Sequence, residues 1–265
     1  SAAGAITVGD EVVLMADGQA GARRGKAAVA FGKDMFLVAW QEGWHGEGGG
    51  SRIHALRVGL DGKPLDAKPI EIAPAKTGVQ ENPRVAFFGG NFLVVWQDLR
   101  NGKDNDVLGA RVSAEGKVLD AKPLAIAVAP RTQVRPDVAA DDKGFMVVWH
   151  GFPGEELEAK LFARRVGADG VAGEPALVSV GSSPRIAWNG KEHLVVFFKA
   201  GGSGGPGVAQ VLAVLQQRVA FALHALDALL QDGALRGGGG QPFVQRGQAH
   251  LFGELQRRID IADAA

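Results

Sequence analysis

The chain has 265 residues, which is enough for one large domain or two small ones with a substantial core. Its 29 basic and 29 acidic residues cancel, so no overall field attracts nucleic acid or another polyanion, and its apolar runs are far shorter than the roughly 20 residues that span a bilayer. Because cysteine is absent, disulfides, thiolate metal sites and a cysteine nucleophile are excluded.

The first predicted element is a β-strand at 6–16, ITVGDEVVLMA, within an N-terminal segment 1–26. It resembles the last strand of the repeated unit described next, with the first three strands missing. It either belongs to a truncated preceding unit or closes a ring by pairing with a later one. The chain begins at Ser1 and not at Met, so we expect a processed product or a fragment of a larger protein.

From residue 27 onward the chain repeats itself with a period of about 54 residues. Each of four copies carries an apolar block that ends in an aromatic residue; the first three have an arginine further on, and the last three have a proline thirteen residues before the aromatic. These marks are Trp40, Trp96, Trp149 and Phe197; Arg57, Arg111 and Arg165; and Pro83, Pro136 and Pro184, with Ala27 in the first copy. They predict units at 27–82, 83–135 and 136–183, and a partial unit with a Gly-rich linker at 184–207.

Each complete unit reads as four short strands. In the second copy, VAFFGGNFLVVW (85–96) is two apolar runs joined by a tight-turn signal, and turns such as Asp61-Gly62 join the third run to the fourth. Four-stranded units of this length in tandem predict an all-β fold, a β-propeller with three full blades and parts of others. A solenoid or a series of sandwiches is the alternative, but a sandwich needs about seven strands. In a propeller, we expect the strand-end aromatics to pack between blades, the prolines to begin the first strands, and the recurring arginines to be structural.

The repeat stops after the Gly-rich linker, and the tail 208–265 is atypical. Apolar residues at helical spacing over 208–231 predict an amphipathic helix. All lysines and tryptophans lie at or before residue 199, which also fits out-of-frame translation of the tail. The sequence therefore leaves a helical appendage and a non-native tail as alternatives.

Loop lengths predict which face of the blades binds a ligand. In an up-and-down sheet the first-to-second and third-to-fourth turns share one end, and here they are tight. The other connections are long and differ between copies, at 41–52, 74–82, 97–105, 130–135 and 150–160. Variable loops on a rigid scaffold usually carry the binding residues, so we expect any ligand on this long-loop face.

The candidate ligand-binding residues lie on these long loops or directly beside them: Trp44, His45, Asp98, Arg100, Asn101, Asp104, Asp106, His150 and Glu155. An exposed Trp44 would offer a platform for a sugar ring or a peptide, and its alternative role is packing over a neighbouring blade. His150 stands where the other copies have Gln41 and Gln97, which favours a polar strand end over a catalytic base.

The run VVWQDLRNGKDND (94–106) is the densest cluster of polar side chains. Its alternating oxygens at Asp104 and Asp106 make a weak calcium site conceivable, because calcium binds six to eight oxygen ligands. The pattern of an EF-hand is absent, and the other copies lack the cluster. Pairing of Asp98 or Asp106 with an arginine is therefore the favoured interpretation, and we expect no other cofactor.

The segment VVWQDLRNGKDNDVLGARVSAEG (94–116), with looser copies at 38–62 and 147–170, resembles a tandem repeat of secreted and surface proteins of bacteria. The resemblance covers about residues 27–199 and extends more remotely to sialidase-like propellers. It implies a propeller fold and an extracellular or cell-envelope location. It does not extend to sialidase chemistry, because the Asp-box turns are missing and a chain without tyrosine has no tyrosine nucleophile.

These observations predict a non-catalytic propeller scaffold of a bacterial exported or cell-surface protein, which binds glycan or protein through the long-loop face. The alternative is a propeller-type glycoside hydrolase or lyase with loop carboxylates, such as Glu42, Asp98 and Glu155, as acid and base. A hydrolase needs two carboxylates about 5–10 Å apart. A third alternative is a fragment without a function of its own. We expect no nucleic-acid partner and no membrane span; the ligand, the blade number and the oligomeric state stay open.

Overall fold

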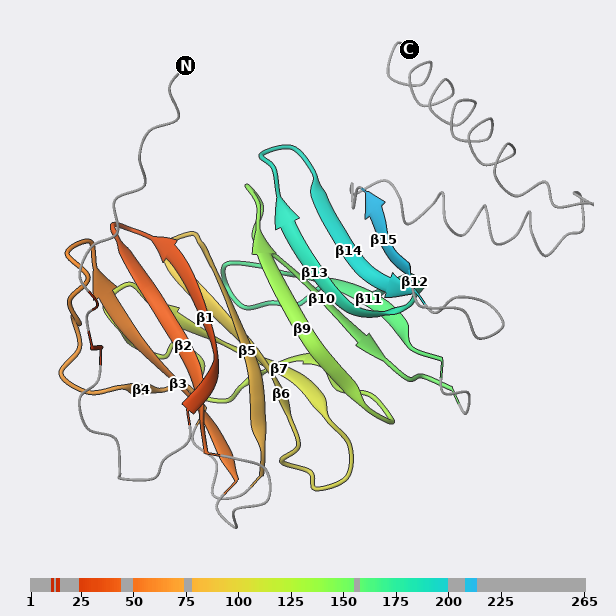
Figure 1. The fold of residues 1–265 in the computed structure, drawn as a ribbon, viewed down its shortest axis with the longest axis horizontal. Helices are drawn as coiled ribbons and strands as arrows, with labels where there is room; N and C mark the ends of the chain where they lie inside the picture. Colours follow the sequence, from red (N-terminus) through yellow and green to blue (C-terminus); the bar gives the residue numbers. More distant parts are fainter. Residues whose placement is uncertain are drawn as a thin grey trace, which may run out of the picture. The chain divides into compact units, whose positions relative to one another are not determined.

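The computed structural model describes residues 11, 13, 14, 24–43, 50–73, 78–154, 158–199 and 208–213 (Figure 1). Over these ranges the chain forms strands and turns and no helix, as the sequence predicts. None of the described residues belongs to a helix long and apolar enough to cross a membrane. The strand expected at 6–16 lies almost wholly outside the described residues.

Four antiparallel sheets follow one another along the chain, and within each the strand order is the chain order. The first sheet contains β1 (Arg24–Gly32), β2 (Met35–Gly43), β3 (Ser51–Gly59) and β4 (Ile70–Glu71). The second contains β5 (Gln80–Phe88), β6 (Asn91–Asp98), β7 (Asp106–Ser113) and β8 (Leu124–Ala127). The third contains β9 (Gln133–Ala140), β10 (Phe145–Gly151), β11 (Lys160–Val166) and β12 (Ala176–Val180). The fourth contains β13 (Ser182–Trp188), β14 (His193–Lys199) and β15 (Val208–Ala213).

The first strands of the four sheets lie next to one another. Strand β1 contacts β5, β5 contacts β9, and β9 contacts β13 (Figure 1). Each sheet therefore runs outward from a shared centre, with its later strands farther away. This is the arrangement of propeller blades, and the four sheets are called blades 1 to 4 below.

The turn between β5 and β6 shows why the sequence forms tight hairpins. Gly89 and Gly90 have φ angles of 59° and 85°. A two-residue turn with positive φ at both central positions matches the twist of the flanking strands, and glycine adopts it without steric cost.

The hydrophobic core consists of layers between adjacent blades. Trp96 packs with residues of blades 1 and 2, Trp149 with blades 2 and 3, and Phe197 with blades 3 and 4. All three side chains are buried. This confirms the expectation that the strand-end aromatics fill the spaces between blades.

The recurring arginines join neighbouring blades at the tight-turn end. The guanidinium of Arg57 pairs with Asp66 at 2.6 Å and donates to the carbonyl oxygen of Ala114, in the next blade, at 2.7 Å. Arg111 repeats both contacts, with Asp120 at 2.7 Å and Ala168 at 2.9 Å. The third blade has Glu174 at the equivalent position, and Arg165 pairs with Asp141 instead.

The helix expected over 208–231 does not begin where the sequence pattern places it. Residues Val208–Ala213 form β15, which pairs antiparallel with β14. The edge of β14 presents backbone N–H and C=O groups, and a strand pairs with them where a helix would not. The rest of the predicted helix lies outside the described residues.

Candidate functional site

Each first strand has a bulge near its beginning. The strand register shifts there, and one residue that is not glycine adopts a left-handed conformation: Lys26, Asn82, Arg135 and Ser183, with φ of 51°, 53°, 52° and 55°. Such a φ is uncommon outside glycine, and a bulge redirects the side chains of its strand. The next residue in blades 2 to 4 is the repeat's proline, which lacks an N–H and so loses no ladder hydrogen bond at a bulge.

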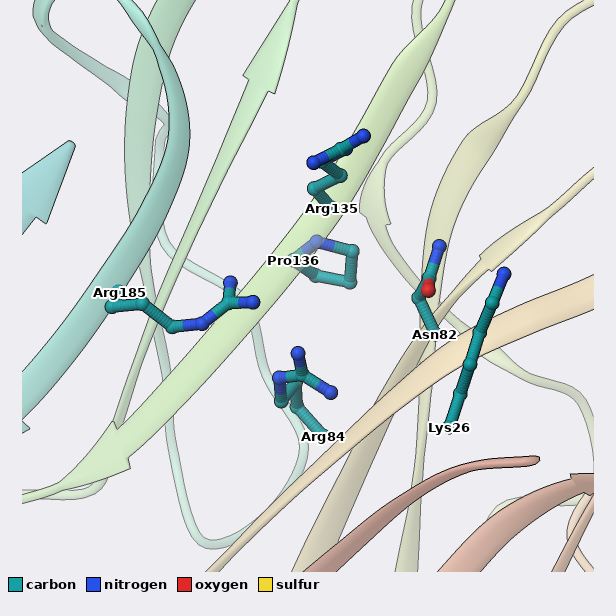
Figure 2. Close-up of a pocket in the computed structure, with 6 residues that line it drawn as sticks. All are labelled: Lys26, Asn82, Arg84, Arg135, Pro136 and Arg185. Carbon is teal, nitrogen blue, oxygen red and sulfur yellow. The ribbon is translucent and has the colours of Figure 1, made fainter. Parts of the chain in front are cut away.

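The bulges surround a pocket at the centre of the blades. The cavity has a volume of about 240 Å³ and is lined by Lys26, Asn82, Arg84, Arg135, Pro136 and Arg185. Every lining residue comes from a first strand, one from β1, two from β5, two from β9 and one from β13. Figure 2 shows the guanidinium ends of Arg84 and Arg185 pointing toward each other beside Pro136.

The buried carboxylate of Asp137 lies beside this pocket. Its Oδ1 is 3.5 Å from Nε of Arg84, and its Oδ2 accepts a hydrogen bond from the backbone N–H of Ile186 at 3.0 Å. Burial raises the pKa of Asp137 above its ordinary value, against the opposing effects of the Ile186 hydrogen bond and the charges of Arg185 and Arg84. Asp137 therefore keeps its proton to a higher pH than a carboxyl group in water does.

A second carboxylate, Glu81, lies one residue before the bulge of β5. Its Oε2 is 3.5 Å from Nζ of Lys26 and accepts a hydrogen bond from Nε2 of Gln97 at 3.1 Å. The partly buried Glu81 is thus held by a cation of the pocket and by an amide of its own blade.

The pocket lies toward the long-loop end of the blades. In blade 2 the beginning of β5 pairs with the end of β6, Gln80 opposite Asp98, and in blade 3 the beginning of β9 pairs with the end of β10. The long loops start where these second strands end. The pocket therefore lies at the end of the blades where the loop lengths predict that a ligand binds.

The predicted site residues Asp98 and Arg100 form an ion pair with each other. Asp98 is fully buried, and its carboxylate accepts hydrogen bonds from Nε1 of Trp96 at 2.8 Å and from the backbone and guanidinium of Arg100 at 2.6–2.9 Å. The pair links the last residue of β6 to the loop that follows the strand. Neither residue lines the pocket.

The side chain of Asn101 holds the loop that contains Asp104 and ends at Asp106. The Oδ1 of Asn101 accepts hydrogen bonds from the backbone N–H groups of Lys103 and Asp104, and its Nδ2 donates to Asp106 at 3.3 Å. Burial, together with the neighbouring charges of Asp98 and Asp104, raises the pKa of Asp106. Among the residues that the structure describes, no three His, Cys, Asp or Glu side chains gather as they would around a metal ion.

His150 is buried at the end of β10 and connects blade 3 to blade 4. Its Nδ1 accepts a hydrogen bond from the backbone N–H of Ser183, the bulge residue of β13, at 3.2 Å. Burial, and next the charge of Arg135, lowers the pKa of His150 to about 4. The imidazole is neutral at pH 7. The other candidates, Trp44, His45 and Glu155, lie outside the described residues.

The pocket residues were missed in the sequence analysis, although a signal for them exists. The repeat's proline was assigned only to the start of a strand. The residues on either side of it are polar in three blades, as Asn82 and Arg84, Arg135 and Asp137, and Ser183 and Arg185. Aligning the copies on the proline would have exposed these two positions.

Comparison with known proteins places the fold among β-propellers. No protein-family model and no curated protein sequence matches the chain. The endo-arabinase of Bacteroides thetaiotaomicron VPI-5482 is similar with a TM-score of 0.51 and 13% identity, over 71% of this chain and 74% of that one. A family 117 glycoside hydrolase of the marine bacterium Zobellia galactanivorans is similar with a TM-score of 0.50 and 9% identity, over 72% of this chain and 66% of that one. Over the residues that the structure describes, the chain is all-β and built of propeller blades, and it spans about two thirds of the second of these structures.

The comparisons correct the expectation of a non-catalytic scaffold. The two solved structures named above, which share the fold, are an endo-arabinase and a family 117 glycoside hydrolase, which is the class of protein in the alternative prediction and not in the main one. The loops show no convergent set of acids in the sequence, and this absence favoured a scaffold. Two described carboxylates that pair with cations of the pocket, Asp137 and Glu81, come from first strands and not from the loops.

Proposed function

We propose that the chain is a propeller-type glycoside hydrolase whose reaction takes place in the central pocket. One observation carries the proposal: two carboxylates on adjacent first strands, Asp137 and Glu81, each lie against a cation that lines the pocket, Arg84 and Lys26 respectively. Hydrolysis of a glycosidic bond uses such a pair, one as the acid and one as the base or nucleophile.

Asp137 suits the role of proton donor. Burial raises the pKa of Asp137 above its ordinary value, which is the direction that proton donation requires. In the proposed reaction Asp137 gives this proton to the glycosidic oxygen as the bond between that oxygen and the anomeric carbon breaks. Proton donation therefore releases the leaving sugar as a neutral alcohol.

Glu81 would act on the opposite side of the sugar. Its carboxylate, with Oε2 3.5 Å from Nζ of Lys26, would take a proton from water as the water oxygen bonds to the anomeric carbon. If Glu81 instead attacks the carbon itself, the covalent intermediate is hydrolysed in a second step. The fold shared with an endo-arabinase and a family 117 glycoside hydrolase supports an activity on glycans.

A lyase is a second candidate, favoured by the cationic lining of the pocket. Elimination from a uronate sugar requires that its carboxylate be neutralised while a neighbouring proton is removed, and Arg84 and Arg185 could supply that neutralisation. A lyase leaves a carbon–carbon double bond in one product, which absorbs ultraviolet light. A hydrolase leaves none.

The test is glycan cleavage by the purified chain and by its Asp137→Asn variant. Against a panel of neutral and acidic polysaccharides, we expect new reducing ends from at least one, and a loss of about 100-fold or more in the variant because its amide cannot donate the proton in the same way. Asp120→Asn is the matched control, since Asp120 is also a poorly exposed carboxylate paired with an arginine but lies outside the pocket. No cleavage of any polysaccharide, or equal activity in the two variants, would contradict the proposal.

A further inference from the structure

The central pocket concentrates positive charge. Among the residues that the structure describes, its lining includes four cationic side chains, Lys26, Arg84, Arg135 and Arg185, and no acidic one. The two carboxylates beside it, Asp137 and Glu81, balance only part of that charge. The whole chain is neutral, with 29 basic and 29 acidic residues, so the concentration is a property of this place and not of the composition.

The four cations come from four different blades. Lys26 belongs to β1, Arg84 to β5, Arg135 to β9 and Arg185 to β13. They approach one cavity from different directions, and Figure 2 shows their side chains around it. A small anion in the cavity would therefore meet cationic donors on several sides.

Holding these cations together has an energetic cost. The pKa of Arg84 is lowered by burial and next by the charge of Arg185, while Asp137 opposes both effects. Three of the four blades also hold a polar bulge residue with positive φ at the pocket, and such strained backbone often occurs at binding sites. An anionic ligand would relieve the repulsion between the two arginines.

The size of the cavity limits what it can hold. Its volume of about 240 Å³ is below the roughly 300–1,000 Å³ of pockets that enclose drug-sized ligands. It suits a single substituted sugar ring better than an oligosaccharide. Arginine is also the side chain whose planar fork of donors best matches carboxylate and sulfate oxygens.

We propose that the pocket binds an acidic sugar residue, through the oxygens of a uronate carboxylate or a sulfate ester, so that the substrate class is an anionic glycan. The inference rests on the proposed function for the statement that the ligand is a glycan. The charge requirement comes from the four cations alone.

The test measures binding by calorimetry to three probes: trigalacturonate, a sulfated galactose oligosaccharide of similar length, and neutral arabinotriose. We expect at least one of the acidic probes to bind. Arabinotriose should bind at least about tenfold more weakly, because it offers the cations no anionic partner. Affinity for the acidic probe should fall as salt rises. The acidic probe that binds more tightly identifies the anionic group.

Two pocket variants and one control locate the site. Arg185→Gln and Arg135→Gln should each weaken binding of the acidic probe by about tenfold, since each removes one charged donor. Lys117→Gln makes the same change in charge in an exposed turn at the tight-turn end of blade 2, and binding should stay within about twofold. Thermal melting curves confirm that each variant is folded.

The outcomes separate this inference from the proposed function. Binding of an acidic probe that depends on Arg185, without cleavage, supports the anionic ligand and contradicts the hydrolase. Cleavage of a neutral glycan, with no binding of either acidic probe, contradicts the anionic ligand and leaves the hydrolase standing. Equal binding by Arg185→Gln and Lys117→Gln also overturns the inference.

Discussion

At the scale of single residues, His150 shows how a side chain that suggests chemistry serves the connection between blades. Its Nδ1 accepts the backbone N–H of Ser183, and in blade 2 the Oε1 of Gln97 accepts the backbone N–H of Arg135 at 3.4 Å. In both cases a polar residue at the end of a second strand holds the bulge of the next blade. A neutral imidazole and an amide can do this equally, because each offers an acceptor.

This role makes stability depend on pH through His150. Its folded pKa of about 4 lies below the ordinary 6.5, so between these values the unfolded chain binds a proton that the folded chain does not. Stability is full above about pH 6.5 and falls as the pH drops toward 4, by about 1–2 kcal/mol between pH 7 and pH 5. His150→Gln should remove this part of the loss, as measured by urea unfolding at the two pH values. An equal difference in unfolding free energy between wild type and variant at both pH values would show that His150 does not titrate as argued.

At the scale of structural elements, the arginine of the third strand connects blade 1 to blade 2 and blade 2 to blade 3. Arg111 combines an ion pair with Asp120, nine residues later, and a hydrogen bond to Ala168 of the following blade. The turn glycine Gly170 packs closely on the guanidinium of Arg111, and Gly116 does the same on Arg57. In blades 1 and 2 the arginine and the aspartate, with the turn glycine of the following blade, are therefore parts of one contact.

We expect Arg111→Met to lower the free energy of unfolding by about 3 kcal/mol, because it leaves the poorly exposed carboxylate of Asp120 without its partner. Chemical denaturation measures the change. The control is Lys33→Met, which removes an exposed ion pair with Glu115 and should change stability little. Similar losses in the two variants would contradict a structural role for the arginine contact.

At the scale of the whole molecule, the core is divided into layers between blades, so each blade depends on its neighbours. Trp96 is fully buried between blades 1 and 2, whereas Trp40 of blade 1 stacks on His54 of its own sheet and belongs to none of the three core layers among the described residues. The same repeat position thus has two environments. Only one of them joins two blades.

Trp96→Ala should therefore destabilise the protein by about 3–5 kcal/mol, the cost of a large cavity in a packed core. Trp40→Ala should cost distinctly less, although both variants remove the same side chain. Thermal and urea unfolding of the two variants make the comparison. A larger loss for Trp40→Ala would show that the layer between blades 1 and 2 is not the main support of the second blade.

Much of the fold could be predicted because its signals are local. Turn glycines, apolar runs and the period of about 54 residues predict four-stranded units, and the structure confirms them. The beginning of the predicted tail helix was wrong, because the open edge of β14 offered a partner that the helical spacing of Val208 and its neighbours does not reveal. The candidate site was also missed, because Arg84, Asp137 and Arg185 share one repeat position but not one residue type.

The sequence by itself determined the strands, the blade repeat, the interblade aromatics and the end of the blades that carries the long loops. These follow from patterns along the chain. Only the tertiary structure decided that four cations and two carboxylates meet at the centre, since they come from first strands that begin about fifty residues apart and become neighbours only when the blades pack together. It also decided that Asp98 and His150 support the fold. Asp98 pairs with Arg100, which the loop brings back to it, and His150 accepts a hydrogen bond from the backbone of Ser183 in the next blade.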